Sequence, residues 1–142
     1  MKFTEFELND TLLDAVYYAN FDEATEIQAK AIPLILNGHD LIGCAQTGTG
    51  KTAAFVLPML NQLSESNSVG VKALILCPTR ELAIQIDRQV QGLAYFTNAV
   101  CKAVYGGGDG VAWDQEREAL EGGADVIIAT PGRLISHLER VM

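Results

Sequence analysis

The sequence contains no long hydrophobic run and no start that directs secretion. Although 49% of its 142 residues are apolar, no stretch approaches the about 18 consecutive apolar residues that a membrane-spanning helix needs. The segment Met1–Glu5 shows neither the basic start nor the apolar core of a secretory signal. We therefore expect a globular cytoplasmic protein.

Cysteine is scarce and unpaired in the sequence. Cys44, Cys77 and Cys101 are widely spaced in apolar segments, and no CxxC pair occurs. This spacing argues against a disulfide framework or a metal site, and it favours reduced thiols in the cytoplasm.

Positive charge is also limited. The 10 Lys and Arg residues stand against 18 Asp and Glu, which gives a net charge of −8. This balance excludes a broad basic surface for nucleic acid. Any contact with nucleic acid must use a few placed groups, such as backbone N–H donors at helix starts, or a basic partner domain.

Short apolar runs alternate with helical segments along the chain. Four runs bounded by turn residues predict β-strands, at residues 40–45, 71–77, 99–105 and 124–129. Helical spacing is present over residues 51–63, after the sequence PTRE and after the sequence TPGR. This alternation predicts an α/β fold with a mostly parallel sheet covered by helices on both faces.

Two further helices are expected before the first strand. Asn9 or Asp10 can cap the first, and Thr25 can cap the second. We expect Pro33 to interrupt the second helix, whereas Pro58 is expected to bend the helix over 51–63 without ending it.

The segment AQTGTGKT, Ala45–Thr52, follows the first predicted strand and opens a helix. Its glycines allow successive N–H groups to point at an anion, and the helix start adds a positive field. Lys51 can reach the β- and γ-phosphates of a nucleotide, and Thr52 can ligate the accompanying magnesium. Ala45 departs from the strict P-loop pattern, which begins with glycine. The segment predicts nucleotide binding, but it leaves GTPases, nucleotide kinases, transport ATPases and helicases open.

Gln28, upstream of this loop, can discriminate between bases. A glutamine amide makes paired hydrogen bonds with N6 and N7 of adenine and mismatches guanine, and Phe21 can supply a flat apolar wall for the base. Taken alone, the segment also fits an exposed helical glutamine and a core phenylalanine.

Five segments together resemble the N-terminal RecA-like domain of the DEAD-box RNA helicases. They are Phe3 with Phe21–Gln28 (the Q motif), Ala45–Thr52 (motif I), Pro78–Ala83 (motif Ia), Gly106–Gly107 (the GG element) and Thr130–Arg133 (motif Ib). The resemblance runs from Phe3 to about Leu134. Asn20 and Ala24 depart from it, because the family has glycine and proline at these positions.

The resemblance implies a helicase ATP-binding domain, with a Q-motif helical preface over residues 1–29 and a partial RecA-like domain over residues 30–142. It implies ATP and Mg²⁺ as ligands, with Lys51 and Thr52 in catalytic positions and Thr52 on the metal. The implied nucleotide contacts are Phe3, Phe21, Thr25, Gln28, Ala45, Gln46, Thr47, Gly48, Thr49, Gly50, Lys51 and Thr52. The implied RNA contacts are Pro78, Thr79, Arg80, Gly106, Gly107, Thr130, Gly132 and Arg133.

The implied RNA segments also have a physical interpretation. Thr79 and Thr130 each follow a predicted strand and can cap the next helix, and each precedes an arginine, Arg80 or Arg133. Helix starts, arginines and the GG element can grip phosphates without reading bases. The alternative is that these segments are only capped helix starts.

No predicted strand after the P-loop ends in an acidic residue, which in-line phosphoryl transfer needs to hold its metal. The family's motif II would follow the TPGR helix, and the sequence ends at Met142. We therefore expect an N-terminal fragment of a helicase that does not hydrolyse ATP alone, lacks its second RecA-like partner domain and self-associates through open strand edges at residues 40–45. A non-enzymatic RNA- or partner-binding module, or another P-loop NTPase, is the alternative.

Other polar residues are expected to be unremarkable in role. His39 and His137 are predicted at the surface, and the run Glu116–Glu118 is predicted to be a solvated face. Trp113 is predicted to anchor packing.

Overall fold

A computed structural model describes residues 1–46, 48–106 and 110–141. The chain divides into two compact units. One contains Met1–Ser66 and Gln89–Asn98, and the other contains Asn67–Arg88 and Ala99–Met142. Within the described ranges, no helix combines the length and the apolar character needed to cross a bilayer.

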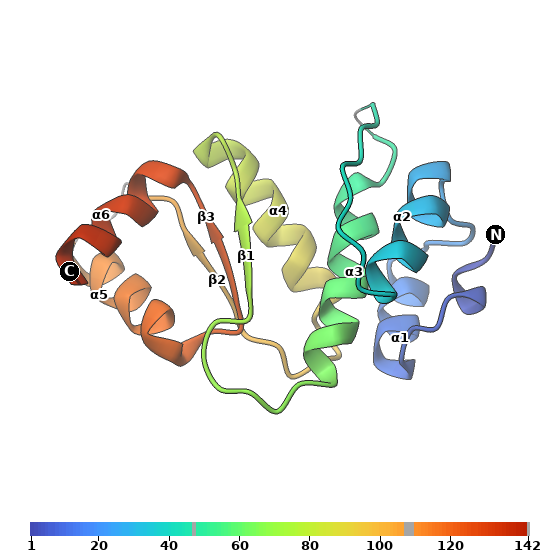
Figure 1. Cartoon of the computed structure of the whole chain (residues 1–142), viewed down its shortest axis with the longest axis horizontal. Coiled ribbons are helices and arrows are strands. Elements are labelled where there is room, and N and C mark those ends of the chain that lie inside the picture. The colour runs from blue at the N-terminus through green and yellow to red at the C-terminus, as the bar shows by residue number, and fades with distance from the viewer. Residues whose placement is uncertain (47, 107–109, 142) are drawn as a thin grey trace. The chain divides into compact units, whose positions relative to one another are not determined.

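Helices build the first unit. They are the 3-10 helix η1 (Phe3–Glu5), α1 (Asp10–Tyr18), α2 (Glu26–Leu36), α3 (Lys51–Ser64) and the end of α4 (Arg80–Leu93) (Figure 1). Asn9 caps α1, because its Oδ1 accepts the Leu12 N–H at 3.0 Å. The Asn9 backbone N–H also donates to Asn61 Oδ1 at 2.8 Å, which ties the start of α1 to α3. The predicted caps at Asn9 and Thr25 are both confirmed.

The prediction that Pro33 interrupts the second helix is wrong, since α2 continues to Leu36. A proline inside a helix removes one backbone hydrogen bond and crowds the preceding turn. That cost is offset because Ile32 is fully buried and because the last carbonyls find donors. The Pro33 carbonyl accepts from Asn37 N, and the Leu34 carbonyl accepts from His39 N. Pro58 likewise leaves α3 unbroken, as predicted.

The second unit is a parallel sheet with helices. Along the chain it contains β1 (Ala73–Leu76), the start of α4 (Arg80–Leu93), β2 (Cys101–Val104), α5 (Gly110–Glu118), the π-helical turn η2 (Ala119–Gly123), β3 (Val126–Ala129) and α6 (Pro131–Val141). The strand order is β1-β3-β2, and both pairings are parallel. The predicted parallel α/β arrangement is therefore confirmed.

The central strand β3 carries the core of this unit. All of its residues are buried, as expected for a parallel strand with both faces covered. Figure 1 shows the start of α4 on one side of the sheet and α5 and α6 on the other. On the α5 and α6 side, Ile127 and Ala129 pack with Val104, and Leu120 and Leu134 cover them.

Asp125 joins the starting ends of the three strands. Its carboxylate accepts from Lys72 Nζ at 2.5 Å and from Val100 N at 2.9 Å. Its backbone N–H donates to the Val100 carbonyl, and its carbonyl accepts from Lys72 N, both at 2.8 Å. The hydrogen bond from Lys72 is the main reason that the pKa of Asp125 lies below its usual range.

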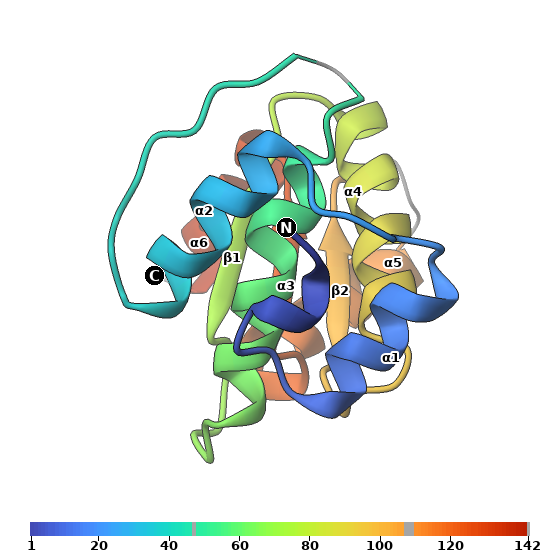
Figure 2. The same ribbon diagram turned by 90° about the vertical axis from the view of Figure 1, so that its right-hand side faces the viewer.

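The strand predicted over residues 40–45 is not formed. The segment follows α2 as an open coil (Figure 2), and Ile42 is 96% exposed. A strand is stable only when a neighbour pairs with its backbone, and the sheet of the described residues consists of β1, β3 and β2. The apolar run therefore has β-propensity without a pairing partner, and the prediction is wrong for this structure.

Candidate functional site

The glycine-rich loop ends in an uncapped helix start. Gly50 lies at the N-cap position of α3 with φ of 76°, and no side chain among the described residues caps the helix. Gly48 also has a positive φ, 85°, and open space on its Cβ side. The first N–H groups of a helix have no partner inside the helix, so this start is available to an external acceptor.

This geometry fits a phosphate group. Backbone donors behind two left-handed glycines, at the positive end of a 14-residue helix, are the kind of arrangement that can bind an anion. Lys51 is exposed and Thr52 is half-buried at the first turn, where an ammonium and a hydroxyl can meet a metal-bound nucleotide. Thr49 Oγ1 donates to the Gln46 carbonyl at 2.6 Å and closes the loop locally. Ala45 is half-buried, and Thr47 lies outside the described residues.

Gln28 links the second helix to this loop. Its Oε1 accepts from Thr25 N at 2.9 Å, and its Nε2 donates to the Gly50 carbonyl at 3.1 Å. In return, the Gln28 backbone N–H donates to Thr25 Oγ1 at 3.4 Å, which completes a capping box. Only 3% of Gln28 is exposed, so the alternative of an ordinary exposed helical residue is wrong. One amide N–H and one carbonyl lone pair of Gln28 are not used by these two bonds.

Two aromatic residues lie together near the N-terminus. Phe3 and Phe21 stack with ring centroids 5.8 Å apart and an interplanar angle of 26°. Phe3 is buried, whereas 37% of Phe21 is exposed. Phe21 can therefore offer a face to a ligand, and Phe3 supports it from behind.

The backbone around Phe21 explains the two departures from the family pattern. Asn20 has a positive φ of 61°, a conformation that asparagine tolerates better than most residues other than glycine. The Ala24 N–H donates to the carbonyl of Met1 at 2.8 Å. A proline at this position has no N–H to give.

The predicted helix starts of the second unit are present. Thr79 Oγ1 accepts from Leu82 N at 3.2 Å and caps α4. Arg80 is exposed, and its guanidinium lies 5.4 Å from the centre of the Tyr105 ring. The Thr130 carbonyl accepts from Leu134 N at 3.1 Å, so α6 begins directly after it.

The remaining predicted RNA contacts lie at these same turns. Pro78 and Gly132 are exposed, and a Cβ at Gly132 would meet nothing within 4 Å. Gly106 has a positive φ of 80° and lies against the side chain of Arg133. Gly107 lies outside the described residues.

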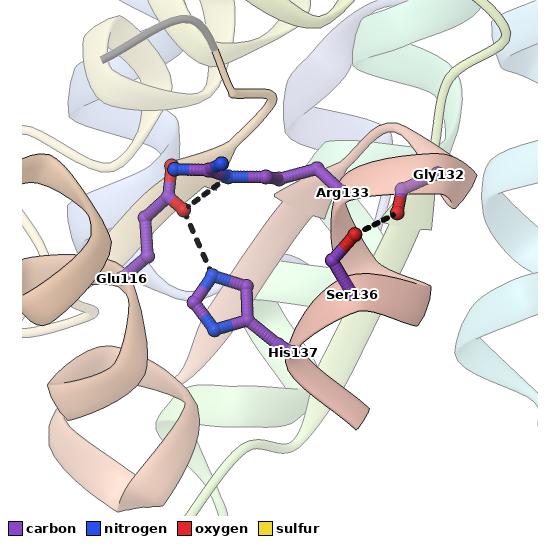
Figure 3. A network of polar contacts seen from close by, with 5 residues as sticks. All are labelled: Glu116, Gly132, Arg133, Ser136 and His137. Carbon is purple, nitrogen blue, oxygen red and sulfur yellow. Dashed lines mark hydrogen bonds and ion pairs between the residues drawn. The ribbon is translucent and has the colours of Figure 1, made fainter. Parts of the chain in front are cut away.

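Arg133 is held by a buried carboxylate that the sequence did not reveal. Its Nε donates to Glu116 Oε1 at 2.8 Å, and His137 Nε2 lies 2.8 Å from the same oxygen (Figure 3). Glu116 is 6% exposed and His137 3% exposed. The predictions of a solvated face at residue 116 and of a surface role for His137 are therefore wrong, whereas His39 is exposed as predicted.

Trp113 packs against the cluster of Glu116, Arg133 and His137. Its ring stacks on His137 with centroids 3.7 Å apart, and the guanidinium groups of Arg133 and Arg140 lie over it at 4.7 and 4.5 Å. The spacing of 133, 137 and 140 places these residues on one face of α6. That spacing could have indicated the polar cluster from the sequence. Ile135 and Leu138 suggested a different, apolar buried face instead, but both are half-exposed.

Comparisons with known proteins point to one family. The sequence matches the DEAD/DEAH box helicase family over residues 25–142. It is 45% identical over 139 residues to the ATP-dependent RNA helicase CshA of Listeria monocytogenes, covering 98% of this chain and 26% of that protein. It is 48% identical over 138 residues to a probable ATP-dependent RNA helicase, ddx27, of Dictyostelium discoideum, covering 96% of this chain and 17% of that protein.

Solved structures agree. A DEAD box protein from Methanococcus jannaschii superposes with a TM-score of 0.88 at 38% identity, covering 99% of this chain and 38% of that one. The RNA helicase Prp28 from Chaetomium thermophilum, bound to ADP, gives a TM-score of 0.86 at 44% identity, covering 98% and 34%. The fold is therefore that of a partial RecA-like domain, and the chain belongs to the DEAD/DEAH box helicase family.

Proposed function

We propose that this chain is the ATP-binding and RNA-backbone-binding part of an ATP-dependent RNA helicase that unwinds short duplexes. The chain spans about a quarter of the length of CshA and less of ddx27, so the activity of a whole helicase is an inference from those relatives. The observation that carries the proposal is the uncapped start of α3, joined through Gly50 to the buried amide of Gln28.

ATP is the proposed nucleotide. The backbone from Ala45 to Thr52 and the Lys51 ammonium hold its phosphates, and Thr52 holds the accompanying Mg²⁺, which neutralises charge on the phosphate oxygens. Gln28 turns its unused amide donor and acceptor toward adenine, and the exposed face of Phe21 covers the base. The capping box fixes the amide of Gln28 before the nucleotide arrives, which lowers the ordering cost of binding.

RNA is the proposed second ligand, bound through its backbone. Thr79 and Thr130 start helices whose first N–H groups can meet phosphates, and Arg80 and Arg133 add charge. These few placed donors account for nucleic-acid binding by a chain with a net charge of −8. Binding without base contacts gives weak dependence on RNA sequence.

We further propose that this chain alone binds ATP without hydrolysing it and acts with a second RecA-like domain. The strands β1, β2 and β3 end before Cys77, Tyr105 and Thr130, so in the part of the chain that the structure describes no strand end carries a carboxylate for the metal. Residues 40–45, where open strand edges were expected, form no strand. Self-association is therefore proposed through β1, an edge strand of the sheet, whose Leu74 and Leu76 share one face and are 50% and 56% exposed. A cytoplasmic location remains a prediction from the sequence.

The decisive experiment compares ATP and GTP binding by calorimetry in the presence of Mg²⁺. We expect the parent chain to prefer ATP, Lys51→Ala to lose affinity for both nucleotides, and Gln28→Ala to lose the preference. Equal affinity of the parent chain for ATP and GTP would overturn the adenine assignment. Phosphate release assays test the proposed lack of ATP hydrolysis, which RNA-stimulated release would contradict. Light scattering tests the proposed self-association, which a strictly monomeric chain would contradict.

A further inference from the structure

The two arginines at the proposed RNA segments have different surroundings. Arg80 is exposed and packs over Tyr105. The side chain of Arg133 is only 20% exposed and is in contact on three sides. Its stem crosses Gly106, where a Cβ would come within 3.4 Å of Arg133 Cδ. Its guanidinium lies over Trp113, and its Nε is bonded to Glu116.

Glu116 is the group that fixes this arrangement. Its side chain is 7% exposed and bonds through one oxygen to both Arg133 and His137 (Figure 3). A buried carboxylate requires such partners, because desolvation without them is costly. The same contact places the Glu116 carboxylate 2.8 Å from Arg133 Nε. The negative charge of the carboxylate partly cancels the positive field of Arg133 that a phosphate would experience.

We infer that Glu116 is a positioning residue that orients Arg133 for RNA and at the same time weakens its attraction for phosphate. The inference rests on the proposed RNA-binding role of Arg133. Glu116 thus makes the motif Ib contact directional, whereas Arg80 is exposed and packs over Tyr105. The charge of Glu116, and not only its hydrogen bond, sets the RNA affinity of this segment.

The substitution Glu116→Gln separates the two effects. A glutamine of the same shape keeps an oxygen that can accept from Arg133 Nε, but it removes the negative charge. A unit charge several ångströms from a phosphate at the protein surface changes affinity roughly threefold to tenfold. We therefore expect Glu116→Gln to bind RNA more tightly by that factor and to steepen the salt dependence by about 0.7 in the slope of log K against log salt.

The experiment measures fluorescence anisotropy of a labelled single-stranded oligouridine with the 142-residue chain over a series of salt concentrations. Glu118→Gln is the matched control, because Glu118 is exposed on the same helix and makes the same change in net charge. Glu116→Ala removes the acceptor as well, so we expect weaker RNA binding than in Glu116→Gln. The Nε–H signal of Arg133 in NMR reports positioning independently: it should persist in Glu116→Gln and broaden by exchange in Glu116→Ala.

The outcomes separate this inference from the proposed function. If Arg133→Ala binds RNA as tightly as the parent chain, or if the parent chain binds no RNA, the proposed role of motif Ib fails, and the inference fails with it. If Arg133→Ala weakens binding but Glu116→Gln behaves like Glu118→Gln, only the inference is overturned. An Arg133 Nε–H signal unchanged in a folded Glu116→Ala variant also overturns the positioning role.

Discussion

Replacing Gly50 with alanine tests the contact that joins Gln28, the proposed adenine-binding residue, to the proposed phosphate loop. A Cβ at this position would lie 2.2 Å from Gln28 Nε2, and the backbone has φ of 76°. The left-handed conformation costs an alanine about 1–2 kcal/mol. Moving the buried amide of Gln28 gives up its bonds to Thr25 and Gly50, about 1 kcal/mol each. We expect Gly50→Ala to lower the free energy of unfolding by about 3–4 kcal/mol.

A double-mutant cycle divides this loss into its two parts. In a Gln28→Ala background the amide is already gone, so Gly50→Ala should cost only the backbone term, and the coupling energy should be about 2 kcal/mol. Gly48→Ala is the matched control, since its φ is 85° and nothing lies within 4 Å of the added Cβ. Equilibrium urea unfolding measures all variants. If Gly50→Ala costs the same in both backgrounds, the Gln28–Gly50 contact does not support the loop.

Three further predictions concern other parts of the chain. The pKa of Asp125 is lower in the folded protein than in the unfolded chain, so Asp125 contributes stability above pH about 4, the unfolded pKa, and this stability is lost as the pH falls through the folded pKa. Asp125→Asn should therefore lose about 1 kcal/mol of unfolding free energy at neutral pH and flatten the acid dependence of the melting temperature. Ala24→Pro removes the N–H that bonds to the carbonyl of the first residue and should lower the melting temperature rather than raise it. Burial raises the pKa of Cys101 to about 11, so iodoacetamide at pH 8 should modify the exposed Cys44 first by mass spectrometry; equal rates would contradict this.

Elements with local signals could be predicted from the sequence. The strands β1, β2 and β3 lie inside the predicted apolar runs, because each run pairs with another that is also present. The helix starts at Asn9, Thr25 and Thr79 were predictable because capping acts within three residues. The helix start after the glycine-rich loop was predictable for the same reason, since the left-handed glycines lie directly before α3.

Features that depend on distant partners could not be predicted. Residues 40–45 have the composition of a strand, but strand formation depends on a neighbouring backbone that composition does not reveal. Pro33 has a local cost that tertiary packing of α2 overrides. Glu116 lies among charged neighbours in the sequence, and only the approach of α6 buries it against Arg133 and His137. Such a buried ionic cluster is a property of two helices together.

The two departures from the family pattern show how one local geometry can be reached by different chemistry. A glycine before Phe21 would reach a positive φ without strain, and Asn20 adopts the same region with φ of 61° because its short polar side chain tolerates it. A proline at position 24 would fix the chain direction before α2 through its ring. Ala24 instead uses a hydrogen bond to Met1, next to the bridge between Lys2 and Glu23. The N-terminal residues therefore take over a constraint that proline would supply covalently, so deletion of the first two residues should loosen the start of α2 and the position of Gln28 with it.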